Sequence, residues 1–225
     1  AILVVGKPLK EYKETINNTN YEVLEYYACA LYFDKGVLVF TKTKNSAVAD
    51  PLLLALKSVD EAVKADTKND AGKRILESYV DLNKRLRASG LNYYFGGDMQ
   101  NAATYFSAAA DCAARPTVGN VDSMMTYYAG FALLNLGKHK EAAEYFKRSI
   151  AISYFGDKDG IVFRNLSACY QAINDKANAE AALVDGFKRF PSSQILLLEM
   201  INFFLNNRED ASSVLPYLHK AQANE

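Results

Sequence analysis

The sequence contains no tryptophan, only two histidines and only three cysteines among its 225 residues. Cys29, Cys112 and Cys169 are odd in number and far apart, which argues against a disulfide framework or a zinc site. We expect all three to be buried free thiols. His139 and His219 lie in different parts of the chain, and neither has a partner at the spacing of a metal site or a catalytic triad. No metal site is therefore expected.

Long hydrophobic runs and an excess of one charge are also missing. A membrane-spanning helix needs roughly 20 apolar residues, and the longest candidates, residues 1–5 and 195–198, are far shorter. Lysine plus arginine and aspartate plus glutamate number 26 each, so no long-range field favours nucleic acid or an anionic membrane surface. We expect a soluble protein that binds no nucleic acid. Because the chain begins at Ala1, a removed signal peptide is conceivable, and both a cytoplasmic and a periplasmic or exported location stay open.

Sites for catalysis are equally scarce. A nucleotide-binding P-loop needs an upstream glycine and a hydroxyl residue after its lysine, and residues 72–74, Gly-Lys-Arg, have neither. Paired carboxylates such as Glu141 and Glu144 fall where a solvated helix face is expected, which favours a charged surface over acid-base chemistry. We therefore predict that the protein is not an enzyme, with no catalytic residues and no cofactor.

One pattern recurs three times in the middle of the chain. Each copy has a small residue, a turn residue, and then an alanine followed four positions later by a large apolar residue. The small residues are Gly90, Gly130 and Ser167, the turn residues are Gly97, Gly137 and Asn174, and the later pairs are Ala102 with Phe106, Ala142 with Phe146, and Ala179 with Leu183. Small residues allow two helices to approach closely, and the large residues fill the space beside them.

This pattern resembles the tetratricopeptide repeat, in which about 34 residues form two packed helices. The resemblance is strong over residues 86–191 and looser over 21–221, where the family's tryptophan and most of its prolines are missing. It implies an all-α fold, a solenoid of helical hairpins wound as a right-handed superhelix with a concave groove. The copies are longer than the family's repeat, so we expect the extra residues in loops near 115–122 and 156–159.

The pattern predicts four segments. Residues 1–20 are expected to be a lead-in, perhaps left over from a preceding helix, and residues 222–225 a short tail. Residues 21–69 are expected to form a degenerate first hairpin, interrupted by an insertion at 36–50 that could be an ordered excursion or a mobile loop. The regular array covers residues 70–221, with about four hairpins of which the last is weak.

In the degenerate hairpin, the first helix is expected to carry Leu24, Tyr27, Ala28 and Leu31 and the second Ala55, Val59 and Ala62. A long helix is expected from Asp70, its possible N-cap, to Phe95.

The resemblance also implies which residues face the groove, because the first helix of each hairpin lines it in this family. The matching positions are Lys84, Arg87, Leu91, Tyr94 and Phe95, then Met124, Tyr127, Phe131, Leu134 and Asn135, then Ile161, Arg164, Ala168 and Gln171. Aromatic residues beside arginines are enriched in binding hot spots. The alternative is that Leu91, Phe131 and Leu134 pack between neighbouring hairpins. The lysine and asparagine pattern with which some family members clamp a terminal carboxylate is absent.

The leading hypothesis is a non-catalytic scaffold that binds a protein or peptide in the groove. In this hypothesis Arg87 and Arg164 pair with carboxylates of the partner, whose apolar side chains lie against Tyr94, Tyr127 and Phe131. The alternative is an accessory or sensory domain that binds a small ligand or sugar in a pocket formed with the 36–50 insertion. The identity of the partner and the oligomeric state do not follow from the sequence.

Overall fold

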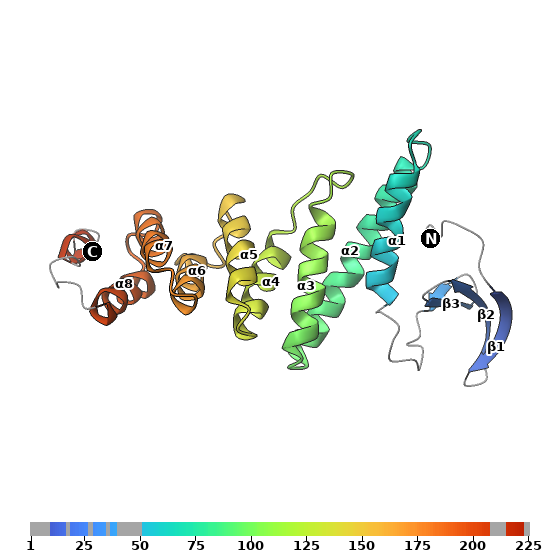
Figure 1. Cartoon of the computed structure of the whole chain (residues 1–225), viewed down its shortest axis with the longest axis horizontal. Coiled ribbons are helices and arrows are strands. Elements are labelled where there is room, and N and C mark those ends of the chain that lie inside the picture. The colour runs from blue at the N-terminus through green and yellow to red at the C-terminus, as the bar shows by residue number, and fades with distance from the viewer. Residues whose placement is uncertain are drawn as a thin grey trace. The chain divides into compact units, whose positions relative to one another are not determined.

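The computed structural model of the chain describes residues 10–16, 19–26, 29–34, 37–39, 51–207 and 215–222 (Figure 1). The chain forms two compact units. The first comprises Ala1–Leu86 with Asp111–Asn120, and the second comprises Arg87–Ala110 with Val121–Glu225. Helices α2 (Gly72–Phe95) and α3 (Met99–Ala113) each contribute residues to both units. None of the helices in the described ranges is long and apolar enough to cross a membrane.

The first unit begins with a four-stranded antiparallel sheet. Its strands β1 (Lys10–Ile16), β2 (Thr19–Tyr26), β3 (Cys29–Asp34) and β4 (Val37–Val39) lie in chain order. The helix expected across Leu24 and Leu31 is therefore wrong, because these residues face each other as partners on β2 and β3. The expected helical lead-in is also wrong where β1 lies. Tyrosine, valine and phenylalanine favour strands, and two-residue gaps between the strands suit hairpins. Residues 40–50 of the expected insertion, and any pocket formed with them, lie outside the described residues.

The rest of the first unit is helical. Helix α1 (Pro51–Ala65) buries Val59 and Ala62, and the first part of α2 buries Ile75 and Leu82. Helix α2 is long, as expected, but Asp70 is not its N-cap. The carboxylate of Asp66 accepts the backbone N–H groups of Asp70 and Ala71 at 2.9 and 3.0 Å, so Asp66 satisfies the donors that precede the helix.

The second unit contains the hairpins that the repeat pattern predicts. Helices α4 (Ser123–Asn135) and α5 (His139–Ala151) pack together, as do α6 (Ile161–Ala172) and α7 (Lys176–Arg189), and α8 (Gln194–Asn206) is followed by α9 (Leu215–Gln222). Each hairpin packs on the next through α5 with α6 and α7 with α8 (Figure 1). The loops at 114–122 and 152–160 contain the extra residues of the longer copies, which confirms the expectation for them.

In the first two copies of the pattern, glycine is required where the two helices of the hairpin meet. A Cβ atom built on Gly130 would lie 2.9 Å from ring carbons of Phe146, and one on Gly90 would lie 2.6 Å from the ring of Phe106. Both contacts are closer than real Cβ atoms tolerate, and both rings are fully buried. The recurring glycine and phenylalanine therefore form one packing unit, in which the missing side chain lets the helix axes approach.

The turn inside each hairpin is also the same. Gly97, Gly137 and Asn174 have φ angles of 80°, 71° and 60°, in the left-handed region that glycine and asparagine adopt most readily. At the end of α4 the N–H of Lys138 donates to the carbonyl oxygen of Leu133 at 3.0 Å, closing a Schellman motif. Equivalent bonds close the other two turns, which explains why glycine or asparagine stands at these three positions.

Candidate partner-binding face

The first helices of the hairpins in the second unit lie against one another. Helix α4 contacts α6, and α6 contacts α8. On the opposite side a cleft of about 310 Å³ opens between the second helices α5 and α7, with α6 at its base. We call the side lined by the first helices the inner side of the array. We define the inner face as the groove positions of this unit: Arg87, Leu91, Tyr94, Phe95, Met124, Tyr127, Phe131, Leu134, Asn135, Ile161, Arg164, Ala168 and Gln171.

Lys84 is the one predicted groove residue that falls in the first unit. Its side chain is exposed. In the second unit, Leu91, Met124 and Leu134 are half-buried, so each is partly packed and partly open to solvent.

An aromatic cluster joins α2 and α4. The ring centroid of Tyr94 lies 5.5 Å from that of Phe95 and 6.3 Å from that of Phe131. Tyr94 and Phe131 are half-buried, whereas Phe95 is 80 % exposed. The sequence pattern did not single out Tyr128, whose ring lies 6.0 Å from Tyr94. The ring of Tyr127 lies 6.5 Å from that of Phe131, so the structure brings all four predicted aromatic residues into one cluster. Phe95 is its exposed member.

Tyr127 is held by packing. Its ring lies 6.0 Å from Phe146 of α5 and 5.9 Å from Tyr154 of the following loop, and its hydroxyl oxygen accepts a hydrogen bond from the side-chain amide of Asn165 at 3.4 Å. Burial raises the pKa of Tyr127 to about 12, so the phenol stays neutral. Tyr127 therefore joins α4, α5 and α6.

Arg87 has a partner within the protein. Its Nη1 lies 2.9 Å from Oδ2 of Asp122, whose side chain is only 5 % exposed. The other oxygen of Asp122 accepts the backbone N–H of Met125 at 3.2 Å, which makes Asp122 the N-cap of α4. Arg87 was expected to be available for a carboxylate of the partner. This ion pair also ties α2 to the beginning of α4.

Arg164 is used in the same way between α6 and α8. Its Nε donates to Oε1 of Glu199 at 3.0 Å, and the two side chains are 45 % and 29 % exposed. Both this pair and the pair of Arg87 with Asp122 join residues 35 positions apart in the sequence, which is close to one repeat length. An acidic residue one repeat downstream of each arginine was therefore the signal that could have indicated both bridges.

Helix α8, the first helix of the last hairpin, carries an apolar stripe that the sequence analysis did not assign to the groove. Ile195, Leu198 and Leu205 on α8 are 39 %, 57 % and 60 % exposed. They follow Ile161, Arg164 and Gln171 by one repeat of 34 positions (195 minus 161, 198 minus 164, 205 minus 171). Extending the groove positions by one more repeat would have found them. We include these three residues and Asn202 in the inner face from here on.

Comparison with known proteins gives a fold but no close relative. No protein-family model and no curated protein match the sequence. Among solved structures, the MamA fragment 41-end from Desulfovibrio magneticus RS-1 matches with a TM-score of 0.51 and 14 % identity, covering 75 % of this chain and 93 % of that one. PilF of Pseudomonas aeruginosa matches with a TM-score of 0.50 and 11 % identity, covering 78 % and 79 %. The helical array has the tetratricopeptide-repeat fold. This confirms the fold expected for the array, and at these identities the likeness concerns the fold alone.

The charge of the inner face of the tetratricopeptide array is one-sided. Its positions carry two arginines and no aspartate or glutamate, although the whole chain has 26 acidic and 26 basic residues. The acidic partners of the arginines, Asp122 and Glu199, lie next to the inner-face positions. The face is therefore apolar and aromatic, with two guanidinium groups whose charge is partly balanced from its edges.

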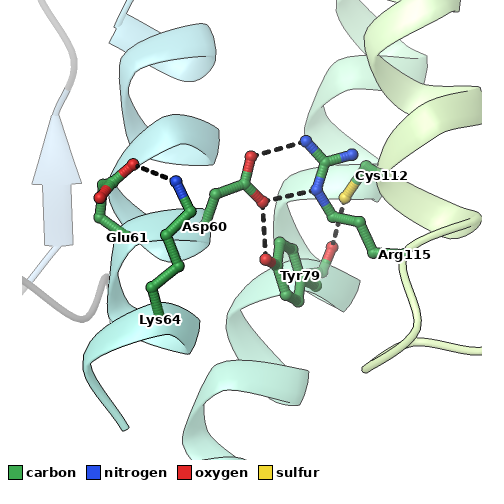
Figure 2. A network of polar contacts seen from close by, with 6 residues as sticks. All are labelled: Asp60, Glu61, Lys64, Tyr79, Cys112 and Arg115. Carbon is green, nitrogen blue, oxygen red and sulfur yellow. Dashed lines mark hydrogen bonds and ion pairs between the residues drawn. The ribbon is translucent and has the colours of Figure 1, made fainter.

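A polar network in the first unit ties three helices together (Figure 2). Arg115 binds the carboxylate of Asp60 through two nitrogens at 2.5 and 2.7 Å, and the Tyr79 hydroxyl donates to the same carboxylate at 2.7 Å. Burial alone would raise the pKa of Asp60, but the hydrogen bonds from Arg115 and Tyr79 outweigh it and lower that pKa. Burial and the same carboxylate raise the pKa of Tyr79. The arrangement holds α1 and α2 to the loop that follows α3.

Two of the cysteines match the expectation of buried free thiols. Cys112 and Cys169 are both buried and unbridged, and burial raises the pKa of each to about 11. The side chain of Cys29 lies outside the part of the chain whose side chains are described. Within that part, no group of three or more histidine, cysteine, aspartate or glutamate residues is placed to hold a metal ion.

Proposed function

We propose that the tetratricopeptide array is a non-catalytic scaffold that binds a segment of another protein along its inner face. The observation that carries this proposal is the exposure of large apolar side chains at inner-face positions, above all Phe95 at 80 %, Leu198 at 57 % and Leu205 at 60 %. Large apolar side chains are costly to leave in water, and exposed apolar surface at related positions is typical of interaction surfaces.

The composition of the face supports the same proposal. Tyrosine and arginine are enriched in binding hot spots, and the inner face carries the half-buried Tyr94 together with two arginines. The rings of Tyr94 and Phe131 are already held by their neighbours, so little side-chain entropy is lost when a partner covers them. The alternative of a small ligand bound with the 36–50 insertion depends on residues 40–50, which lie outside the described residues.

Site-specific photo-crosslinking tests the proposal. A benzophenone amino acid is introduced in place of Phe95, in place of Leu205, and, as a control on the second helix α5, in place of exposed Lys140. We expect irradiation in cells of the source organism to link the same protein, identified by mass spectrometry, at both inner-face positions and not at Lys140. Adducts at Lys140 alone would place binding on the outer side and contradict the proposal.

A further inference from the structure

The cleft on the side opposite the inner face has an apolar floor and short walls. Helix α6 lies between α5 and α7 in the array and packs on both (Figure 1). The cleft of about 310 Å³ has Phe163 and Leu166 of α6 as its floor, and both residues are buried. Its walls include Ala151 of α5 and Ala181 of α7. Because alanine side chains are short, the space between the two second helices stays unfilled.

The floor favours an aromatic occupant over an aliphatic one. The ring of Phe163 is stacked on that of Phe155 at 5.8 Å and lies 6.1 Å from that of Phe190, so it is already held in place. Tyr170 adds a second ring to the lining. Aromatic pairs gain energy beyond their buried area, and rings that are already fixed lose little entropy when a ligand covers them.

The dimensions of the cleft suit a group of two fused rings. Phe163 and Tyr170 are seven residues apart on α6 (170 minus 163), which is about 10.5 Å along the helix. An apolar cavity of about 150 Å³ binds benzene, and small-molecule sites begin at roughly 300 Å³. A cleft of about 310 Å³ therefore has room for a ring system of the size of indole.

The two ends of the cleft differ in polarity. Ile150, near the end of α5, and Phe163, in the first turn of α6, form an apolar end. Tyr170 and Asn178 flank the turn between α6 and α7 and form a polar end. The side-chain nitrogen of Asn178 donates to Oδ2 of Asp175 at 2.7 Å. This bond fixes the amide and leaves its oxygen as an acceptor, so the polar end favours a ligand with a hydrogen-bond donor.

The charges at the rim cancel. Lys147 on the α5 wall forms an ion pair with Glu144, and Asp185 on the α7 wall forms one with Arg189. Each pair lies along its own helix and is neutral as a whole. A charged ligand would therefore leave water without gaining a net opposite charge at the rim, which favours a neutral ligand.

We propose that the cleft between α5 and α7 binds a neutral aromatic ring system of indole size that carries one hydrogen-bond donor. The ring lies over Phe163 and Leu166, and the donor faces the amide oxygen of Asn178. Such a ring arrives either as a free small molecule or as a tryptophan side chain of another protein. This site lies on the side opposite the inner face, and neither proposal depends on the other.

Indole itself is the first probe. The chain contains no tryptophan, so indole fluorescence excited where tyrosine does not absorb reports the ligand alone. We expect saturable binding to the full chain with a Kd of about 1 mM or tighter, the range open to a ligand of so few atoms. Indole-3-acetate, an anion, and tryptamine, a cation, should both bind more weakly. Absence of saturable indole binding would overturn the proposal.

Filling the cleft locates the site. Ala181→Leu places a larger side chain in the space and should weaken indole binding by about tenfold or more. The matched control is Ala177→Leu, the same change at an exposed position of the same helix that does not line the cleft. Leu205→Gln on the inner face and Val63→Gln, at a 37 % exposed valine on α1, should also leave the affinity unchanged. Full affinity in Ala181→Leu would refute the site.

The polar end has its own test. N-methylindole lacks the N–H donor and should bind about fivefold more weakly than indole. Asn178→Ala should abolish this preference, with an unchanged thermal midpoint as the check on folding. Equal binding of both compounds by the natural protein would contradict the role assigned to Asn178.

A third ligand distinguishes the two sources of the ring. N-acetyltryptophanamide carries indole on a peptide-like backbone. Binding as tight as that of indole, and lost in Ala181→Leu, would assign the cleft to a tryptophan side chain of another protein. Binding of indole alone would assign it to a free small molecule. Either result supports the site, whereas binding of both ligands that Ala181→Leu leaves unchanged would overturn it.

Discussion

Arg87 and Asp122 form an ion pair of 2.9 Å that ties helix α2 to the first turn of α4. Asp122 is 5 % exposed and also caps α4 through the backbone N–H of Met125. A carboxylate with both roles contributes more to the free energy of unfolding than a helix cap alone does, because its removal also leaves a guanidinium group without its partner.

Asp122→Ala should therefore lower the free energy of unfolding by about 2 to 4 kcal/mol. The matched control is Asp175→Ala, because Asp175 caps α7 through the N–H of Asn178 at 3.2 Å without an arginine partner. Asp175→Ala should lower the free energy of unfolding by only about 1 kcal/mol. Urea unfolding measures both, and equal losses would show that the bridge to Arg87 adds nothing.

Gly130→Ala tests the close approach of α4 and α5. Alanine inside a helix normally stabilises it by up to about 1 kcal/mol relative to glycine. Here the new Cβ atom would lie 2.9 Å from the buried ring of Phe146, and overpacking costs about 1 to 3 kcal/mol. We expect a lower thermal midpoint, a still lower one for Gly130→Leu, and partial recovery when Gly130→Ala is combined with Phe146→Leu. A raised midpoint in Gly130→Ala would mean that Phe146 moves freely.

These two sites show what the sequence could predict. The glycine and phenylalanine pairs and the left-handed turn residues lie within one hairpin, so local spacing was enough to place them. The arginines were placed on the correct helices, but their acidic partners lie one repeat away and belong to the next hairpin. The helix expected across Leu24 and Leu31 was wrong. Apolar residues at helical spacing can also lie on two adjacent strands of a hairpin, and Leu24 and Leu31 pair there across β2 and β3.

The stability of the first unit should depend on pH through Asp60. Its pKa is lowered in the folded protein, so its contribution is present above the unfolded value of about 3.9 and is lost as the pH falls through the folded value. Asp60→Asn should be less stable than the natural protein at pH 7, and the difference should shrink as the pH falls below about 4. Unfolding curves between pH 7 and pH 3 measure this difference. A difference that stays constant would contradict the role assigned to the ionised carboxylate.

The two buried thiols should be unreactive in the native state. The pKa of about 11 for Cys112 and Cys169 leaves little thiolate at pH 8, and both side chains are buried. In a Cys29→Ser variant, a chromogenic disulfide reagent should detect no thiol in native buffer and both thiols in denaturant. Rapid reaction of either thiol in native buffer would show that the helices around it open easily.

The affinity of the crosslinked partner for inner-face variants tests the central claim most directly. Phe95→Gln and Leu205→Gln change side chains that are 80 % and 60 % exposed, so both should leave the thermal midpoint nearly unchanged. Titration of the purified partner should show at least a tenfold loss of affinity in the double variant and no loss in Val63→Gln. A double variant that binds the partner as tightly as the natural protein would contradict binding on the inner face.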